Sequence, residues 1–156
     1  MKIKWKPLII SVLSALAVGG LSGLAVGQDF VRYKVLELPA GSPPGWVFPV
    51  VWNILYILMG ISAYLVWSSK SRLKEPAVFL YVVQLIVNFL WAPLFFGAGW
   101  YLFALLWLLF LLYLAAAMVY DFYQISPLAA YLQIPYLLWL LFAAYLNLGV
   151  WMLNKV

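Results

Sequence analysis

The 156-residue sequence contains no cysteine and no histidine. These absences exclude disulfide bonds, thiolate nucleophiles, imidazole bases and zinc sites built from the usual ligands. Charge is also scarce, because Asp, Glu, Lys and Arg make up only 8% of the chain, against roughly 25% in an ordinary soluble domain. So few charges cannot cover the surface of a soluble protein. A water-soluble globule and most familiar catalytic sites are therefore excluded.

Hydrophobic residues make up 69% of the chain, and the mean hydropathy is +1.07. This composition is typical of a protein whose solvent is lipid. The net charge of +5 does not indicate a nucleic-acid partner, because the basic residues form short clusters beside apolar runs. Such clusters orient and anchor a protein in a membrane. The sequence predicts an integral membrane protein.

Continuous apolar stretches of membrane-spanning length occupy residues 7–26, 46–67, 77–96, 100–120 and 128–152. Crossing about 30 Å of hydrocarbon takes about 20 helical residues. A membrane barrel would instead need short segments of alternating polarity. Apart from a long first loop at 28–45, the connections are short, which makes successive helices antiparallel neighbours. We expect an all-α membrane protein, a single domain of residues 1–156 forming an up-and-down bundle of five transmembrane helices.

The N-terminal stretch also has features of a secretory signal peptide. Lys2, Lys4 and Lys6 precede the apolar run, and Ala25, Val26 and Gly27 imitate a small-residue cleavage site. The apolar run is longer than the 7 to 15 residues typical of a signal peptide. Its length favours a membrane span.

The distribution of Lys and Arg predicts the orientation. With five spans, one side of the membrane receives the N-terminus and residues 70–74, and the other receives the first loop and the C-terminus. The first side holds Lys2, Lys4, Lys6, Lys70, Arg72 and Lys74, and the second holds Arg32, Lys34 and Lys155. The positive-inside rule then places the N-terminus in the cytoplasm and the first loop outside.

Small residues recur at intervals of four along the first predicted helix. A stripe of this kind lets two helix backbones approach closely, either within one bundle or between two copies of a chain. Packing within the bundle is the commoner use, and we favour it here. The stripe consists of Ser11, Ala15, Gly19, Gly23 and Gly27.

The second, third and fifth predicted helices combine amides, proline and large aromatics. Gln84, Asn88 and Trp91 share one face of the third, and Trp52 and Trp139 lie deep in the second and fifth. Amides at membrane depth either join helices by hydrogen bonds or line a ligand cavity. Aromatic planes with a few amides suit a flat, largely apolar ligand, and they serve equally as ordinary core filling.

No charged residue lies inside a predicted span, since Asp29, Glu37, Glu75 and Asp121 all fall in loops or at span ends. A proton-coupled pump or a relay for charged substrates normally needs such a residue. The sequence therefore argues against a pump and against such a relay. The lack of cysteine and histidine and the scarcity of acidic residues also predict no metal site.

The spaced motifs of these helices resemble the translocator protein family, also called the tryptophan-rich sensory protein or peripheral benzodiazepine receptor family. The resemblance covers nearly the whole chain and implies a five-helix bundle that is commonly dimeric. It is carried by Pro39, residues 42–46, Pro49, Trp52, Tyr56 and Gly60; by Gln84, Asn88, Trp91, Pro93 and Gly97; and by Pro135, Tyr136, Trp139, Ala143 and Asn147.

The resemblance implies an intramembrane pocket, closed by the first loop, that binds porphyrins and related tetrapyrroles, and in some members cholesterol or synthetic benzodiazepine-site ligands. Some bacterial members degrade protoporphyrin in light, and the two tryptophans held responsible look like Trp52 and Trp139. Porphyrin is then a ligand, and no cofactor is expected. The family's pocket positions correspond to Trp52, Tyr56, Asn88, Trp91, Trp139 and Ala143.

The first loop departs from the family pattern. The family's Trp-Tyr pair reads Arg32 and Tyr33 here, and an aromatic position reads Gly41. We expect Arg32, with Lys34, to pair with porphyrin carboxylates, and Tyr33 to contact the ligand. The C-terminal region lacks the Tyr-basic pair of sterol-binding members, so we do not expect high-affinity cholesterol binding.

These features together predict a porphyrin-binding receptor in a bacterial cytoplasmic membrane. Light-dependent porphyrin degradation through tryptophan is the one reaction that the resemblance suggests. Two alternatives stay open: a transporter of small apolar solutes, and a membrane scaffold protein without a ligand of its own.

Overall fold

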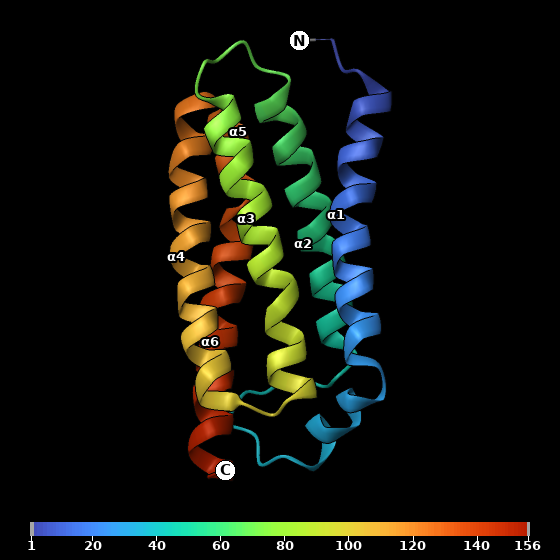
Figure 1. Cartoon of the computed structure of the whole chain (residues 1–156), viewed down its shortest axis with the longest axis vertical. Coiled ribbons are helices and arrows are strands. Elements are labelled where there is room, and N and C mark those ends of the chain that lie inside the picture. The colour runs from blue at the N-terminus through green and yellow to red at the C-terminus, as the bar shows by residue number, and fades with distance from the viewer. Residues whose placement is uncertain (1, 156) are drawn as a thin grey trace.

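The computed structural model describes residues 2–155, which form helices joined by short connections and contain no strand. Helices α1, α2, α3, α4 and the pair α5 and α6 lie side by side along one direction (Figure 1). The elements are α1 Trp5–Val26, η1 Gly27–Val35, α2 Val47–Trp67, α3 Lys74–Ala92, η2 Pro93–Gly97, α4 Tyr101–Ile125, α5 Pro127–Tyr131 and α6 Ile134–Asn154.

Within residues 2–155, five helical segments are long and apolar enough to cross a membrane, which confirms the predicted five-span all-α bundle. The N-terminal end of α1 lies at one end of the bundle (Figure 1). The first loop and the C-terminal end of α6 lie together at the other end. We call this second end the loop end.

The last predicted span, 128–152, is broken in the structure. A short helix, α5, ends at Tyr131, and α6 starts at Ile134 with Pro135 in its first turn. Proline has no N–H, and its ring clashes with the carbonyl four residues earlier, so it is accommodated at a helix start and not inside one. Pro135 therefore begins α6 and does not continue the helix from α5.

Two other predicted boundaries also shift. Helix α4 continues to Ile125, so Asp121 lies in its last turns and not in a connecting loop. Helix α3 starts at Lys74, and at Pro93 it gives way to the π-helical turn η2, in which the Ala98 N–H donates to the Pro93 carbonyl at 2.9 Å. Pro93 cannot donate to the preceding turn, and the local rearrangement accommodates it.

Helix α1 packs closely against α2 along the N-terminal part of its small-residue stripe. The Ser11 hydroxyl donates to the Gly60 carbonyl at 2.7 Å, and Ala15 is buried. A Cβ atom added at Gly60 would lie 2.5 Å from Val12 Cα, and one added at Gly19 would lie 2.4 Å from the Tyr56 ring. This part of the stripe is therefore packed within the bundle, as predicted. The contacts also make α1 an integral helix of the fold.

Candidate ligand cavity

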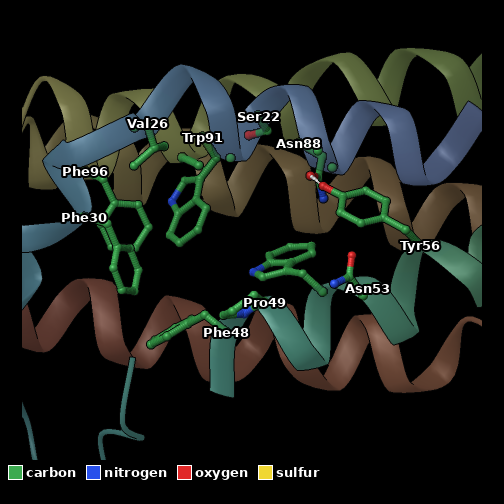
Figure 2. A pocket seen from close by; sticks show the side chains of 16 residues that line it. Ser22, Val26, Phe30, Phe48, Pro49, Asn53, Tyr56, Asn88, Trp91 and Phe96 are labelled. Carbon is green, nitrogen blue, oxygen red and sulfur yellow. Dashed lines mark hydrogen bonds between the residues drawn. The ribbon is translucent and has the colours of Figure 1, made fainter. Parts of the chain in front are cut away.

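A cavity of about 490 Å³ lies at the loop end, between α1, α2 and α3 and beneath η1. This volume falls in the range of small-molecule sites. Figure 2 shows its labelled side chains converging from several helices. The lining residues are Gly19, Gly20, Ser22, Gly23, Val26, Gly27, Phe30, Phe48, Pro49, Trp52, Asn53, Tyr56, Asn88, Trp91, Ala92 and Phe96.

The α1 wall of the cavity is made mostly of glycine. Gly20, Gly23 and Gly27 line it, and a Cβ atom added at any of the three would meet nothing within 4 Å. The missing side chains leave the space that the cavity occupies. The C-terminal part of the small-residue stripe is thus used for volume, and the N-terminal part for close packing.

The facing walls are aromatic. The Trp52 ring stacks on the Tyr56 ring at 5.7 Å between centroids and lies 6.5 Å from the Trp91 ring. Phe30 of η1 lies 5.1 Å from Phe96, closing the wall near the first loop. Stacked and tilted rings of this kind present broad apolar surfaces to a ligand.

A chain of hydrogen bonds runs from the cavity wall into the core. The Tyr56 hydroxyl donates to Asn88 Oδ1 at 2.6 Å, the bond drawn in Figure 2. Asn88 Nδ2 donates to the Tyr136 hydroxyl at 2.8 Å, and this hydroxyl donates to Gln84 Oε1 at 2.8 Å. The four side chains come from α2, α3 and α6, so the two alternatives for the amides both apply to Asn88. It joins helices and it lines the cavity.

A second polar contact fixes the orientation of Trp91. Its indole Nε1 donates to Asn147 Oδ1 at 3.2 Å, and Asn147 Nδ2 donates to the Tyr101 carbonyl at 2.7 Å. Both side chains are buried. The Trp91 ring is therefore held in place by α6 and α4 before any ligand arrives.

The predicted site residues fall into two groups. Trp52, Tyr56, Asn88 and Trp91 line the cavity together. Trp139 and Ala143 do not: the Trp139 ring lies behind Trp52, edge to face at 6.5 Å, and Ala143 is buried in the core. Trp139 borders a shallow groove between α2 and α6 instead.

The two loop residues of the prediction also lie outside the cavity lining. The Arg32 Nη1 donates to the Gly97 carbonyl at 2.8 Å, which ties η1 to η2. The Tyr33 ring is buried against Phe30 and Phe48, at 5.8 and 5.2 Å between ring centroids. Both residues hold the loop over the cavity. Arg32 and Lys34 are exposed, whereas Tyr33 is buried.

The segment after η1 is fastened to α6. The Glu37 N–H donates to Asn154 Oδ1 at 3.0 Å, and Asn154 Nδ2 donates to the Glu37 carbonyl at 2.9 Å. The Tyr145 hydroxyl donates to the Ala40 carbonyl at 2.8 Å, and Pro39 packs against Gly149. The loop is thus a lid attached to η2 at one side and to α6 at the other.

Sequence reasoning missed several residues of the cavity wall. Phe30, Phe48 and Phe96 contribute rings from three different elements, and Asn53 adds a second amide. Gly20, Gly23 and Gly27 could have indicated the cavity, because three glycines near the end of a membrane helix leave space for a ligand. Which rings fill the opposite side depends on how the helices are rotated, and the sequence does not state it.

No group of three or more acidic, histidine or cysteine residues that could hold a metal ion occurs within residues 2–155. The cavity is accordingly apolar and aromatic, with amide and hydroxyl groups as its polar features. Fold and site together define an integral membrane protein with an aromatic cavity at one end of a five-span bundle.

Comparison with known proteins narrows this class. The TspO/MBR family model matches residues 10–152, and the chain belongs to this family. It is 45% identical to the human translocator protein, over 83% of this chain and 82% of that protein. It is 41% identical to the pig translocator protein, over 97% and 92% of the two chains, and 35% identical to the tryptophan-rich protein TspO of Archaeoglobus fulgidus, over 94% and 96%.

Proposed function

We propose that the protein is a membrane receptor that binds porphyrins or related tetrapyrroles in this cavity. The observation that carries the proposal is the composition of the cavity wall, which combines large aromatic faces with two amides and one phenol. A flat conjugated ligand gains affinity by burying its faces against Trp52 and Trp91, and the polar groups fix its orientation.

The amide and phenol of the inner wall act as one unit in this proposal. Asn88 is held by Tyr56 and Tyr136, so its position is set before the ligand binds. Peripheral carboxylates of a porphyrin would point away from this wall toward the lid. Lys34 is exposed there and available to pair with them, whereas the guanidinium of Arg32 is already bonded to the Gly97 carbonyl.

Binding is tested by quenching of tryptophan fluorescence on titration with protoporphyrin IX in detergent or nanodiscs. Asn88→Ala should weaken binding by about 1 to 3 kcal/mol, because a buried partner is left unpaired. Gln133→Ala, which removes a buried amide bonded to Ser62 outside the cavity lining, serves as the matched control and should retain most of the affinity. Unchanged affinity in a folded Asn88→Ala protein would contradict the proposed site.

The proposed chemistry is light-dependent porphyrin degradation. With no cysteine or histidine in the sequence, the bundle offers no thiolate or imidazole. The reactivity would come from the excited pigment and oxygen, with Trp52 as the electron donor on the cavity wall. Trp139 lies 6.5 Å behind Trp52 and would act through it.

Replacing either tryptophan with phenylalanine separates stacking from oxidation. Trp52→Phe and Trp139→Phe should each keep protoporphyrin binding and slow its bleaching under illumination. Phenylalanine preserves a ring but is much harder to oxidise. Bleaching in darkness, or at full rate in the double variant, would reduce the function to that of a receptor.

Transport of small apolar solutes is the second candidate, favoured by one observation. Gly20, Gly23 and Asn53 line the cavity and are exposed, so the bundle does not fully enclose the cavity. Flux of a fluorescent apolar solute across proteoliposomes, absent in empty liposomes, would support transport. A scaffold without a ligand would show neither flux nor porphyrin binding.

We also propose that the protein is a homodimer in a bacterial cytoplasmic membrane, with its N-terminus inside. The clusters of Lys and Arg at 2–6 and 70–74 support this orientation. The orientation is tested by the labelling of Lys2→Cys and Lys34→Cys with a membrane-impermeant thiol reagent in intact cells. The dimer is tested by single-molecule photobleaching in liposomes.

A further inference from the structure

Aromatic rings continue from the cavity to the surface at the loop end. The Trp52 ring lies 6.5 Å from Trp139, Trp139 lies 5.6 Å from Phe142, and Phe142 lies 6.3 Å from Tyr145. The last three side chains recur at intervals of three on α6, so they lie along one face of the helix. This series joins a cavity-lining indole to an exposed phenol.

The outer end of the series differs from the buried tyrosines near the cavity. Tyr145 is 46% exposed, and its hydroxyl donates to the Ala40 carbonyl of the lid. Tyr56 and Tyr136 are 4% and 1% exposed, and their hydroxyls donate to the neutral amides of Asn88 and Gln84. Of these three phenols, only Tyr145 is exposed at the surface of the bundle, where its hydroxyl meets the backbone of the lid.

This difference decides where an oxidised side chain is stable. A phenol that loses an electron becomes strongly acidic and must release its proton. A neutral amide is no base, and a cation left buried without a charged partner is costly. Tyr56 and Tyr136 are therefore poor end points for an oxidation, although both lie close to Trp52. Tyr145 can release its proton to water at the lid.

Trp139 is suited to pass an oxidation onward. Its Nε1 atom is buried and has no hydrogen-bond partner within residues 2–155. An indole radical cation there has no group to receive its N–H proton, so it keeps the proton and stays strongly oxidising. It can then take an electron from a neighbouring donor.

A second tryptophan beside Trp52, Trp91, leads into the core. Between ring centroids, Trp91 lies 6.5 Å from Trp52, Phe95 lies 5.4 Å from Trp91, and Tyr101 lies 5.1 Å from Phe95. Tyr101 is buried at 8% exposure. An oxidation moving along this branch reaches no solvent-exposed phenol.

We propose that Trp52, Trp139 and Tyr145 form a route that carries oxidising equivalents from the cavity to the surface under the lid, with Phe142 as the bridging ring. The proposal rests on the photo-oxidative function above. The photoexcited porphyrin takes one electron from Trp52 and passes it to O₂, which forms superoxide as the oxidant that bleaches the pigment and leaves a Trp52 radical cation. Trp139 then reduces Trp52, and Tyr145 reduces Trp139 while releasing one proton to water. An external reductant such as ascorbate then restores Tyr145.

The route protects the cavity wall, because the oxidising equivalent leaves Trp52 before oxygen modifies its indole ring. Its test is illumination of the protein with protoporphyrin IX in air, followed by peptide mass spectrometry and by electron paramagnetic resonance of freeze-trapped samples. The wild-type protein should show a tyrosyl radical at Tyr145. Tyr145→Phe should lose this signal and accumulate oxidised Trp52 and Trp139 at least threefold faster.

Two further variants exclude indirect effects. Trp139→Phe keeps Tyr145 and its bond to Ala40 in place but should abolish the tyrosyl signal. Tyr113→Phe removes a tyrosine on α4 that is 70% exposed and lies off the route, and it should behave as wild type. A tyrosyl radical that survives Trp139→Phe would overturn the proposal.

The two levels of the proposal fail in different ways. Bleaching of bound pigment with equal tryptophan oxidation in wild type and Tyr145→Phe would overturn the route and leave the photo-oxidative function standing. Absence of light-driven bleaching in the wild-type protein, with binding retained, would overturn both.

Discussion

Helices α1 and α2 use the same residue type for opposite purposes at their two ends. Away from the lid, Gly60 lets the backbones touch, because any Cβ there would lie 2.5 Å from Val12 Cα. Near the lid, Gly20 and Gly23 face open space and form one wall of the cavity. Glycines on the facing sides of two helices therefore do not all serve close packing. What stands across from each glycine decides whether it provides contact or volume.

The largest expected effect comes from the same substitution at the two ends. Gly60→Ala forces apart two backbones that cannot yield, and it should lower the free energy of unfolding by about 1 to 3 kcal/mol. Gly20→Ala meets no atom and should raise it by up to about 1 kcal/mol through helix propensity. Chemical denaturation in detergent, followed by circular dichroism, measures both. Equal destabilisation would remove the distinction between the two ends.

Filling the cavity should separate binding from stability. Gly23→Leu places a branched side chain on the cavity wall, and we expect protoporphyrin affinity to fall at least about tenfold, about 1.4 kcal/mol. The unfolding free energy should change by less than about 0.5 kcal/mol, as for other substitutions without steric conflict. Fluorescence quenching and denaturation of one preparation provide the two numbers. A collapsed fold would show that Gly23 belongs to the packed part of the stripe.

A smaller change tests the packed end alone. Ser11→Ala removes the hydrogen bond to the Gly60 carbonyl and should cost about 1 kcal/mol of unfolding free energy. Ser14→Ala is the matched control, since its hydroxyl bonds only to the Ser11 carbonyl of its own helix and the residue is exposed. Porphyrin affinity should stay the same in both variants. Loss of affinity in Ser11→Ala would mean that the two ends are coupled.

The smallest expected effect concerns the lid. Arg32→Gln removes an exposed contact to the Gly97 carbonyl, so stability should change by less than about 0.5 kcal/mol. Because Arg32 Nη1 already bonds to the Gly97 carbonyl of η2, we expect protoporphyrin and its dimethyl ester to lose affinity equally. Lys34→Gln should weaken only the diacid. Isothermal titration of both ligands distinguishes the cases, and a diacid-specific loss in Arg32→Gln would assign it to carboxylate pairing.

Hydropathy was sufficient to predict the five spans, because the cost of burying backbone in lipid leaves helices as the available structure. The break before Ile134 was not predicted, although Pro135 cannot lie inside a regular helix without disrupting it. The position of Trp139 was not readable. Whether this ring borders the cavity or stands behind Trp52 depends on the rotation of α6 against α2, which side-chain packing sets across the whole interface.

The loop residues show the same limit. The charge of Arg32 suggested a carboxylate partner, and that pairing stays a prediction; the bond from its guanidinium to a backbone carbonyl of η2 was not predicted. The carbonyl of Gly97, the last residue of η2, lies at a helix end, where carbonyls lack partners within the helix, and residue types alone do not show which side chain it binds. Tyr56 and Asn88 were predicted to belong together from the family resemblance, and their hydrogen bond gives that grouping a physical basis.

The double hydrogen bond between Glu37 and Asn154 has a mechanical consequence for the lid. The Asn154 side chain bonds to both the N–H and the carbonyl of Glu37, as the backbone of a paired strand would. The lid is therefore held by a residue in the last turn of α6. With further fastenings at Arg32 and Ala40, the chain between anchors is only a few residues long, and each residue spans at most about 3.6 Å. Segments this short do not allow the lid to move away from the cavity as one unit. Opening must proceed by releasing one anchor while the others serve as a pivot.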